Sequence, residues 1–310
     1  MQPFVLYNSE QRKKVEFVPR VEGQIDLYVC GMTVYDYCHI GHARTVVAFD
    51  YIIRFLRSQG WKVKYVRNIT DIDDKIIKRA NENGESISDL TSRFIDAMNE
   101  DFAKLGCLAP DVAPKATDYI KQMQDMISNL VDNGTAYPSN NGDVYFEVEK
   151  FAKYGRLSGR KLEDMQAGAS ERVDVEVEKK HPFDFVLWKH AKENEPSWAS
   201  PWGNGRPGWH IECSAMVNKY LGKTIDIHSG GKDLIFPHHE NEIAQSKGYS
   251  GKIPANWWMH CEFLLVDGGK MSKSLNNVYL LKDIESRGYD PLVYRLFTYS
   301  SSYRTKINFT

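Results

Sequence analysis

Two histidines flank a glycine early in the chain, at His39, Gly41 and His42. The apolar run 25–29 before them is typical of a strand, and the amphipathic segment 43–58 after them is typical of a helix. Backbone N–H groups at such a helix start attract phosphate, imidazoles add hydrogen-bond donors, and glycine has no Cβ to hold off a flat ring. The three residues therefore predict a nucleotide site, although the tetrapeptide alone fits an ordinary helix start about equally well.

A second candidate for phosphate binding follows the glycine pair at 268–269 and reads Lys-Met-Ser-Lys-Ser over residues 270–274. A loop of this kind can close on a polyphosphate and bring Lys270 and Lys273 to the place where negative charge develops. Taken alone, it fits a solvated charged loop equally well. Together with the histidine pair, it indicates an ATP-using site assembled from the two ends of the chain.

Cysteine, histidine and glutamate residues suggest a metal site. The cysteines, at positions 30, 38, 107, 213 and 261, are odd in number and scattered, which favours metal binding or catalysis in a reducing compartment over disulfides. His238 and Glu242 are four residues apart on a predicted helix and can point at one ion, and Cys30 ends the first predicted strand. Thiolate, imidazole and carboxylate groups are zinc ligands, but Cys213 also fits a buried structural thiol. Spacing leaves the ligand set open, and the competing residues are His210, His228, His239 and Glu240.

The elements around these residues predict an α/β fold. Strand, helix and strand over 25–29, 43–58 and 62–66 imply a right-handed crossover in a parallel sheet. A β-hairpin pattern at 135–148 interrupts this order, and helical and strand patterns resume over 209–228. We predict a Rossmann-type doubly wound parallel sheet with an inserted α+β connective domain and a short C-terminal helical segment. The expected boundaries are 1–110 and 201–265 for the two halves of the catalytic domain, 111–200 for the insertion, and 266–310 for the lysine loop and the start of a helical domain.

Charge and hydropathy exclude several classes of protein. The 310 residues include 40 basic and 41 acidic side chains, a balance without a strong electrostatic footprint for nucleic acid, although a local basic surface remains compatible with it. No apolar run is long enough to span a bilayer, and no signal peptide is evident. We expect a cytoplasmic protein of two or three domains.

The two phosphate-site motifs, His-Ile-Gly-His at 39–42 and Lys-Met-Ser-Lys-Ser at 270–274, resemble the two signatures of class I aminoacyl-tRNA synthetases and occur in the same order. Longer stretches narrow the resemblance to the cysteinyl-tRNA synthetase family of bacteria. These stretches read CGMTVYD at 30–36, RNITDIDDK at 67–75, GWHIECS at 208–214 and FPHHENE at 236–242.

The resemblance implies activation of L-cysteine by ATP to cysteinyl-adenylate and transfer of the cysteinyl group to the 3′ end of tRNA(Cys). The catalytic residues that it implies are His39, His42, Lys270 and Lys273. Those implied for ATP binding are His39, Gly41, His42 and Lys273, and those implied for substrate binding are Gly31, Thr70 and Trp209. The implied metal ligands are Cys30, Cys213, His238 and Glu242.

The implied metal is one Zn²⁺ per subunit, and Mg²⁺ is expected with ATP. An apolar pocket would separate cysteine from serine by only about 1–3 kcal/mol, whereas coordination to zinc favours a thiolate over a neutral hydroxyl. Because four protein ligands and a substrate thiol would crowd the ion, we expect Glu242 to be displaceable. Two of the implied substrate residues also have ordinary explanations, since Trp209 fits an indole packed in the core and Thr70 fits a helix cap.

The resemblance also implies that this chain is the catalytic half of such an enzyme, without the C-terminal anticodon-binding domain, and we expect a monomer. The expected partners are L-cysteine, ATP and tRNA(Cys), with no membrane. A cysteine:amino-sugar ligase of mycothiol biosynthesis is the alternative within the fold, because it makes the same adenylate and also lacks an anticodon domain. A non-catalytic zinc- or tRNA-binding module is disfavoured because both ATP signatures are intact.

Overall fold

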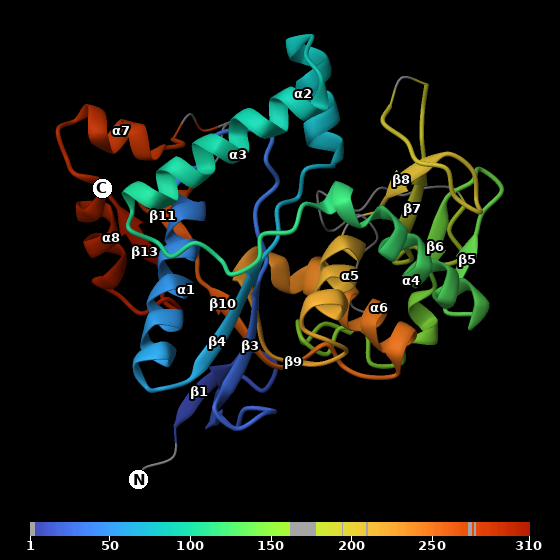
Figure 1. Ribbon diagram of the computed structural model, residues 1–310, viewed down its shortest axis with the longest axis horizontal. Helices are drawn as coiled ribbons and strands as arrows, with labels where there is room; N and C mark the ends of the chain where they lie inside the picture. Colours follow the sequence, from blue (N-terminus) through green and yellow to red (C-terminus); the bar gives the residue numbers. More distant parts are fainter. Residues whose placement is uncertain (1–3, 162–177, 194, 209, 272–274, 276) are drawn as a thin grey trace.

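A computed structural model of the chain describes residues 4–161, 178–193, 195–208, 210–271, 275 and 277–310. At its centre is a parallel sheet with the strand order β10-β9-β3-β4 (Figure 1). The strands are β3 (Gln24–Val29), β4 (Lys62–Arg67), β9 (Ile225–Gly231) and β10 (Ala255–Cys261). All three neighbouring pairs run parallel, and the predicted α/β class is confirmed.

Helices cover both faces of this sheet (Figure 1). They are α1 (Ile40–Ser58), which connects β3 to β4, and α5 (Ile211–Tyr220) and α6 (Glu240–Ser250), which flank β9 in the chain. Successive side chains of a strand point to opposite faces. On β3, Leu27 packs in a cluster with Phe49 of α1, and the neighbouring Tyr28 packs in a cluster with Met216 of α5 and Ile243 of α6. The sheet is therefore doubly wound.

The inserted segment forms an antiparallel sheet with the strand order β5-β6-β7-β8. Its strands are β5 (Ala136–Pro138), β6 (Val144–Phe146), β7 (Phe185–His190) and β8 (Gly205–Pro207), and η2 (Val148–Lys150) follows β6. Helix α4 (Ile120–Asp132), preceded by η1 (Ala116–Tyr119), packs its buried side chains against Phe146 and Trp188 of this sheet. The predicted hairpin is present as β5 and β6. Strand β7 pairs with β6, and β8, which lies beyond residue 200, pairs with β7.

Two helices lie between the first sheet segment and the insertion, and both begin at a side-chain cap. Asp73 caps α2 (Asp74–Asn83), and Ser86 caps α3 (Ile87–Lys104). Helix α3 packs in one cluster with α7 (Leu281–Ser286) and α8 (Pro291–Tyr299), close to the C-terminus (Figure 1).

The segment that follows α6 forms two strands. The first strand is β10, which ends at Cys261. The second is β11 (Leu264–Val266), which pairs with β12 (Gly269–Lys270) and β13 (Ile307–Phe309) in a small separate sheet. A contact from a distant part of the chain stabilises the break between them, because the buried guanidinium of Arg44 donates to the carbonyl of Glu262, at 2.8 Å, and to that of Phe263.

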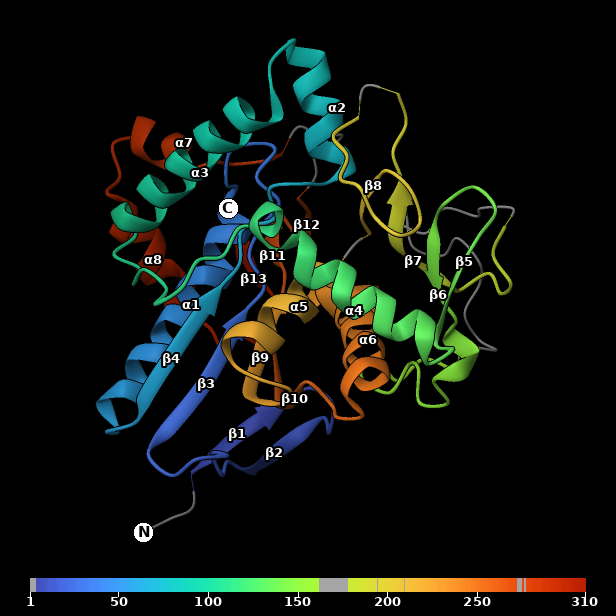
Figure 2. The ribbon, with the colours of Figure 1, turned by 45° about the vertical axis from the view of Figure 1, so that its right-hand side comes forward.

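The N-terminal residues form a short hairpin of β1 (Val5–Asn8) and β2 (Lys13–Glu16) (Figure 2). Ser9 N–H donates to the carbonyl of Trp258 at 2.8 Å, and the Asn8 amide donates to the carbonyl of Asn256 at 2.9 Å, so the hairpin is attached to β10. Within the described ranges, none of the helices has the length and apolarity needed to cross a membrane.

Candidate active site

The candidate site lies where the order of the sheet reverses. Strands β3 and β9 are neighbours, but the chain continues from β3 toward one edge of the sheet and from β9 toward the other. The carboxyl ends of parallel strands at such a reversal form the usual ligand crevice of an open α/β sheet. Cys30 stands at this point, and its backbone N–H donates to the carbonyl of Ser229 at 2.8 Å.

Four buried side chains converge at the crevice and could hold a metal ion. One ligand atom from each of Cys30, His210, Cys213 and Glu242 lies within 4.8 Å of the others. The Cys30 sulfur is 4.0 Å from the Cys213 sulfur and 3.7 Å from Glu242 Oε1. Zinc–ligand bonds of about 2.0–2.3 Å imply separations of this order around a tetrahedral ion, and two thiols, an imidazole and a carboxylate form a set that binds zinc. The residues present therefore fit a zinc ion.

Glu242 is held between two histidines. Its Oε1 is 2.8 Å from His210 Nδ1, and its Oε2 is 2.7 Å from His228 Nε2. Burial alone would raise the pKa of Glu242, but the charge of His228 and the hydrogen bonds of both imidazoles lower it to about 2. Burial would likewise lower the pKa of His210, but hydrogen bonds to Cys213 and Glu242 raise it to about 10. The carboxylate is therefore ionised at neutral pH despite its burial.

The two thiols differ in their acidity. The hydrogen bond from Cys30 lowers the pKa of Cys213 to about 7, although burial opposes that shift. Burial raises the pKa of Cys30 well above its ordinary value. Because the thiolate is the form that binds a metal, Cys213 is prepared as a ligand, and Cys30 must lose its proton when a metal binds.

His238 lies beside the four converging residues and not among them. It is buried, and its ring stacks on that of His210 with 4.3 Å between the ring centroids. A second potential ligand group in the described part of the chain consists of Cys30, His228 and His239. The sequence leaves His210, His228, His239 and Glu240 as competitors for the ligand set. His210 lies in the motif GWHIECS, and His239 and Glu240 lie in the motif FPHHENE.

The predicted nucleotide residues gather at the start of α1. His39 caps the helix by accepting the His42 N–H at Nδ1 at 3.2 Å, and the two imidazole rings stack with centroids 3.6 Å apart. A Cβ on Gly41 would lie 2.9 Å from the terminal carbon of Met271, so the lysine-bearing segment reaches this helix start. Lys270 is exposed in β12.

The predicted substrate residues Gly31 and Thr70 lie on adjoining segments that continue from β3 and β4. Val34 N–H donates to the carbonyl of Thr70 at 3.1 Å, which extends the pairing of the two strands. Asn68, which the sequence did not single out, joins them through its side-chain amide. Two further predicted site residues, Trp209 and Lys273, lie outside the described residues.

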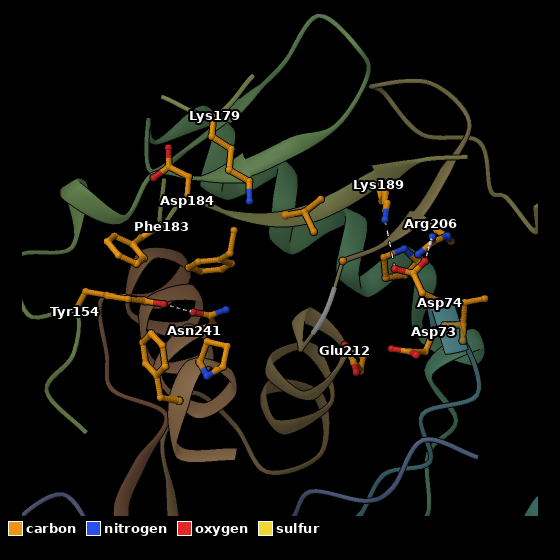
Figure 3. Close-up of a pocket in the computed structure, with 17 residues that line it drawn as sticks. Asp73, Asp74, Tyr154, Lys179, Phe183, Asp184, Lys189, Arg206, Glu212 and Asn241 are labelled. Carbon is orange, nitrogen blue, oxygen red and sulfur yellow. Dashed lines mark hydrogen bonds and ion pairs between the residues drawn. The ribbon is translucent and has the colours of Figure 1, made fainter. Parts of the chain in front are cut away.

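A pocket of about 150 Å³ opens beside the cluster of Cys30, His210, Cys213 and Glu242, between the catalytic sheet and the insertion. Figure 3 shows Asp73 and Glu212 from the catalytic domain facing Lys179, Lys189 and Arg206 from the insertion. Glu212 directly precedes Cys213, and burial raises its pKa to about 8. The charged side chains that line the pocket are mixed in sign, because the three cations are accompanied by Asp73, Asp74, Asp184 and Glu212. Lys189 and Arg206 are both paired with Asp74.

Comparison with known proteins identifies the family. Residues 16–310 match the family described as "tRNA synthetases class I (C) catalytic domain". A cysteine–tRNA ligase of Acinetobacter baumannii (strain ATCC 17978) is 77% identical over the whole chain, which covers 65% of that protein. The cysteine–tRNA ligase of Psychrobacter cryohalolentis is 59% identical over the whole chain, which covers 63% of it. The chain thus spans somewhat less than two thirds of the length of these relatives.

Solved structures support the fold alone. A Mycobacterium tuberculosis methionyl-tRNA synthetase in complex with methionyl-adenylate has a TM-score of 0.69 and 14% identity, covering 92% of this chain and 66% of that one. A structure described as a putative arginyl-tRNA synthetase from Campylobacter jejuni has a TM-score of 0.61 and 12% identity, covering 92% of this chain and 65% of that one. Because the family match extends over residues 16–310, the chain belongs to the catalytic-domain family of class I (C) tRNA synthetases.

Proposed function

We propose that the chain activates L-cysteine with ATP to form cysteinyl-adenylate and, in the full-length protein, transfers the cysteinyl group to the 3′ end of tRNA(Cys). The observation that carries this proposal is the position of the cluster of Cys30, His210, Cys213 and Glu242. Cys30 leaves β3 at the same edge of the sheet at which His39 begins α1, so a metal-bound thiol and an ATP phosphate would be neighbours. An adenylate-forming enzyme selective for a thiol needs that proximity.

The proposed metal is zinc, and its ligands would be Cys30, Cys213 and Glu242 with one imidazole. The four-residue spacing on the helix favours His238 as the fourth ligand, whereas the ligand-atom distances favour His210. Zinc supplies selectivity, because it binds a thiolate far better than a hydroxyl. Comparing zinc content after His238→Asn and after His210→Asn distinguishes the two candidates. Loss of the ligand itself is expected to remove stoichiometric zinc, whereas loss of a histidine that only orients a ligand is expected to cost about 10- to 100-fold in affinity.

In the first proposed step, the cysteine carboxylate attacks the α-phosphorus of ATP, and pyrophosphate leaves. His39 and His42 would hold phosphate oxygens at the positive end of α1, and Gly41 would admit the adenosine. Lys270 and Lys273 would neutralise the charge that develops on pyrophosphate, with Mg²⁺ accompanying the nucleotide. Orientation and electrostatic stabilisation would supply most of the rate acceleration.

In the second proposed step, a ribose hydroxyl at the tRNA 3′ end attacks the adenylate carbonyl, and AMP leaves. The pocket between the catalytic sheet and the insertion supports this step, because it reaches Glu212 beside the cluster and carries Lys179 on its opposite wall. Lys179 would pair with a phosphate of the RNA end, whereas Lys189 and Arg206 are already paired with Asp74.

The test of the activation step is ATP–pyrophosphate exchange that depends on the amino acid. Exchange is expected with cysteine and is expected to be absent with serine at comparable concentrations. Absence of exchange with cysteine in protein that carries stoichiometric zinc would overturn the proposal. Transfer is then tested by offering tRNA(Cys) and an amino-sugar as alternative acceptors to the full-length protein.

A further inference from the structure

Asn68 follows β4 directly, and its side-chain amide is fixed at both ends. The side chain is almost fully buried, with 2% of the residue exposed. Its Oδ1 accepts the backbone N–H of Gly31 at 2.7 Å, and its Nδ2 donates to the Thr70 hydroxyl oxygen at 3.1 Å. Because a backbone N–H can only donate, the Gly31 contact identifies the amide oxygen and therefore settles which way the amide faces.

This orientation determines what the Thr70 hydroxyl can do. A hydroxyl has one hydrogen and two lone pairs, and Thr70 uses a lone pair to accept from Asn68. Among the residues that the structure describes, no acceptor for the Thr70 hydroxyl hydrogen is found. Thr70 is itself only 6% exposed. It therefore presents a donor whose oxygen is held in place and whose hydrogen is available to a ligand.

The donor is rigidly placed beside the cluster. Gly31 follows Cys30 in the chain, and a Cβ on Gly31 would lie 1.8 Å from the carbonyl oxygen of Asn68, so the two segments touch backbone to backbone. Thr70 is anchored to the same segment, because its carbonyl accepts the Val34 N–H at 3.1 Å. An amino acid whose thiol reached the cluster would have its α-carbon groups near these residues.

We propose that Asn68 is a positioning residue that directs the Thr70 hydroxyl hydrogen to the carboxylate of the amino-acid substrate. This inference rests on the proposed function. Of the groups on the amino-acid substrate, only the carboxylate is a good acceptor for the Thr70 hydroxyl hydrogen. The α-ammonium group has no lone pair, and a thiol or thiolate bound to a metal is a poor acceptor. A fixed donor at one carboxylate oxygen would leave the other oxygen free to attack ATP.

The substitution Asn68→Asp tests the direction of this hydrogen bond with little change in shape. One carboxylate oxygen still accepts the Gly31 N–H, but the other now accepts the Thr70 hydroxyl hydrogen and withdraws it from the ligand. In cysteine-dependent exchange at pH 8, we expect the KM for cysteine to rise about tenfold, equivalent to about 1.4 kcal/mol. The KM for ATP and the zinc content are expected to stay at wild-type values.

Substitutions at Thr70 complete the test. Thr70→Val should raise the cysteine KM to a similar extent, Thr70→Ser should preserve it, and Asn68→Asp combined with Thr70→Val should be no worse than either change alone. Cysteamine, which lacks the carboxylate, should inhibit exchange in the wild type and in Asn68→Asp with equal Ki values.

Several results would overturn the inference: an unchanged cysteine KM in Asn68→Asp, additive losses in the double variant, or a parallel rise in the KM for ATP. A tighter inhibition of Asn68→Asp by cysteamine would also overturn it, because Thr70, relieved of the hydrogen bond from Asn68, would then be accepting from the ammonium group. Wild-type protein without cysteine-dependent exchange would contradict the proposed function itself, which separates the two failures.

Discussion

Cys213 is the side chain on which the chemistry of the cluster depends most directly. It lies 4.0 Å from the Cys30 sulfur, and the hydrogen bond from that thiol stabilises its ionised form. Glu242 is already ionised between His210 and His228. Before any metal binds, the cluster therefore holds an ionised carboxylate paired with imidazole groups and a thiol that loses its proton near neutral pH. A divalent cation would stabilise both anionic ligands once they are buried.

Replacing Cys213 by serine is expected to abolish zinc binding and cysteine activation together, because a neutral hydroxyl is a poor zinc ligand. Metal analysis of the purified protein and pyrophosphate exchange provide the two measurements. Cys107→Ser is the matched control, since Cys107 is half-buried and outside the cluster, 3.8 Å from an Arg295 nitrogen. A Cys213→Ser protein that retained one zinc per chain would show that this thiol is not a ligand.

Asp101 on α3, outside the candidate site, is expected to make the free energy of unfolding depend on pH. Burial raises its pKa to about 6, so the folded state favours the protonated carboxyl. The stabilisation from that proton is complete below about pH 4 and is lost as the pH rises through about 6. At pH 7.5, Asp101→Asn should therefore raise the free energy of unfolding by about 1 kcal/mol after allowing for solvent screening, and the melting temperature should rise with it. At pH 4 the melting temperature should be unchanged. Equal gains at both pH values would contradict this explanation.

At the scale of elements, the sequence predicts the framework of the catalytic sheet well. The strand predicted at 25–29 is β3 (Gln24–Val29), and the helix predicted at 43–58 is α1 (Ile40–Ser58), because apolar periodicity and glycine stops are local signals. The break between β10 and β11 has no local signal, since it depends on Arg44 reaching across from α1. The positions of His210 beside Glu242 and of Asn68 between Gly31 and Thr70 likewise depend on contacts between distant segments.

The start of α1 offers a prediction about the nucleotide. A Cβ on residue 41 would lie 2.9 Å from the end of Met271 and 3.0 Å from the His39 ring. Gly41→Ala should therefore fold normally, since alanine favours helix and Met271 is flexible, but should displace the ring that caps the helix. We expect the KM for ATP to rise about tenfold, equivalent to about 1.4 kcal/mol, while the KM for cysteine stays unchanged. Equal increases in both KM values would show a general disturbance and not a nucleotide contact.

At the scale of the whole molecule, the insertion is joined to the catalytic sheet by charged contacts around Asp74, the first residue of α2 (Figure 3). Arg206 of β8 pairs with Asp74 and with Glu195, the latter at 3.4 Å, and Lys189 of β7 reaches Asp74 at 3.3 Å. The Arg206 side chain is only 5% exposed, so its pairing is less screened by water than an ordinary surface ion pair. The same residues form one wall of the pocket beside Glu212, which links the attachment of the insertion to the shape of the proposed acceptor site.

Arg206→Met is expected to loosen this attachment while leaving the metal cluster intact. Removing a buried guanidinium leaves Glu195 without its ion-pair partner, so the melting temperature should fall by several degrees. Arg93→Met is the matched control, because Arg93 pairs with Glu85 at 2.7 Å but its side chain is 47% exposed, and such surface pairs contribute little.

Cysteine-dependent exchange should persist in Arg206→Met, since the cluster and α1 are unchanged, whereas cleavage of the insertion in limited proteolysis should accelerate. Equal thermal shifts in the two variants would show that the Arg206 pairs do not hold the insertion, and loss of exchange would show that the insertion supports the activation step itself.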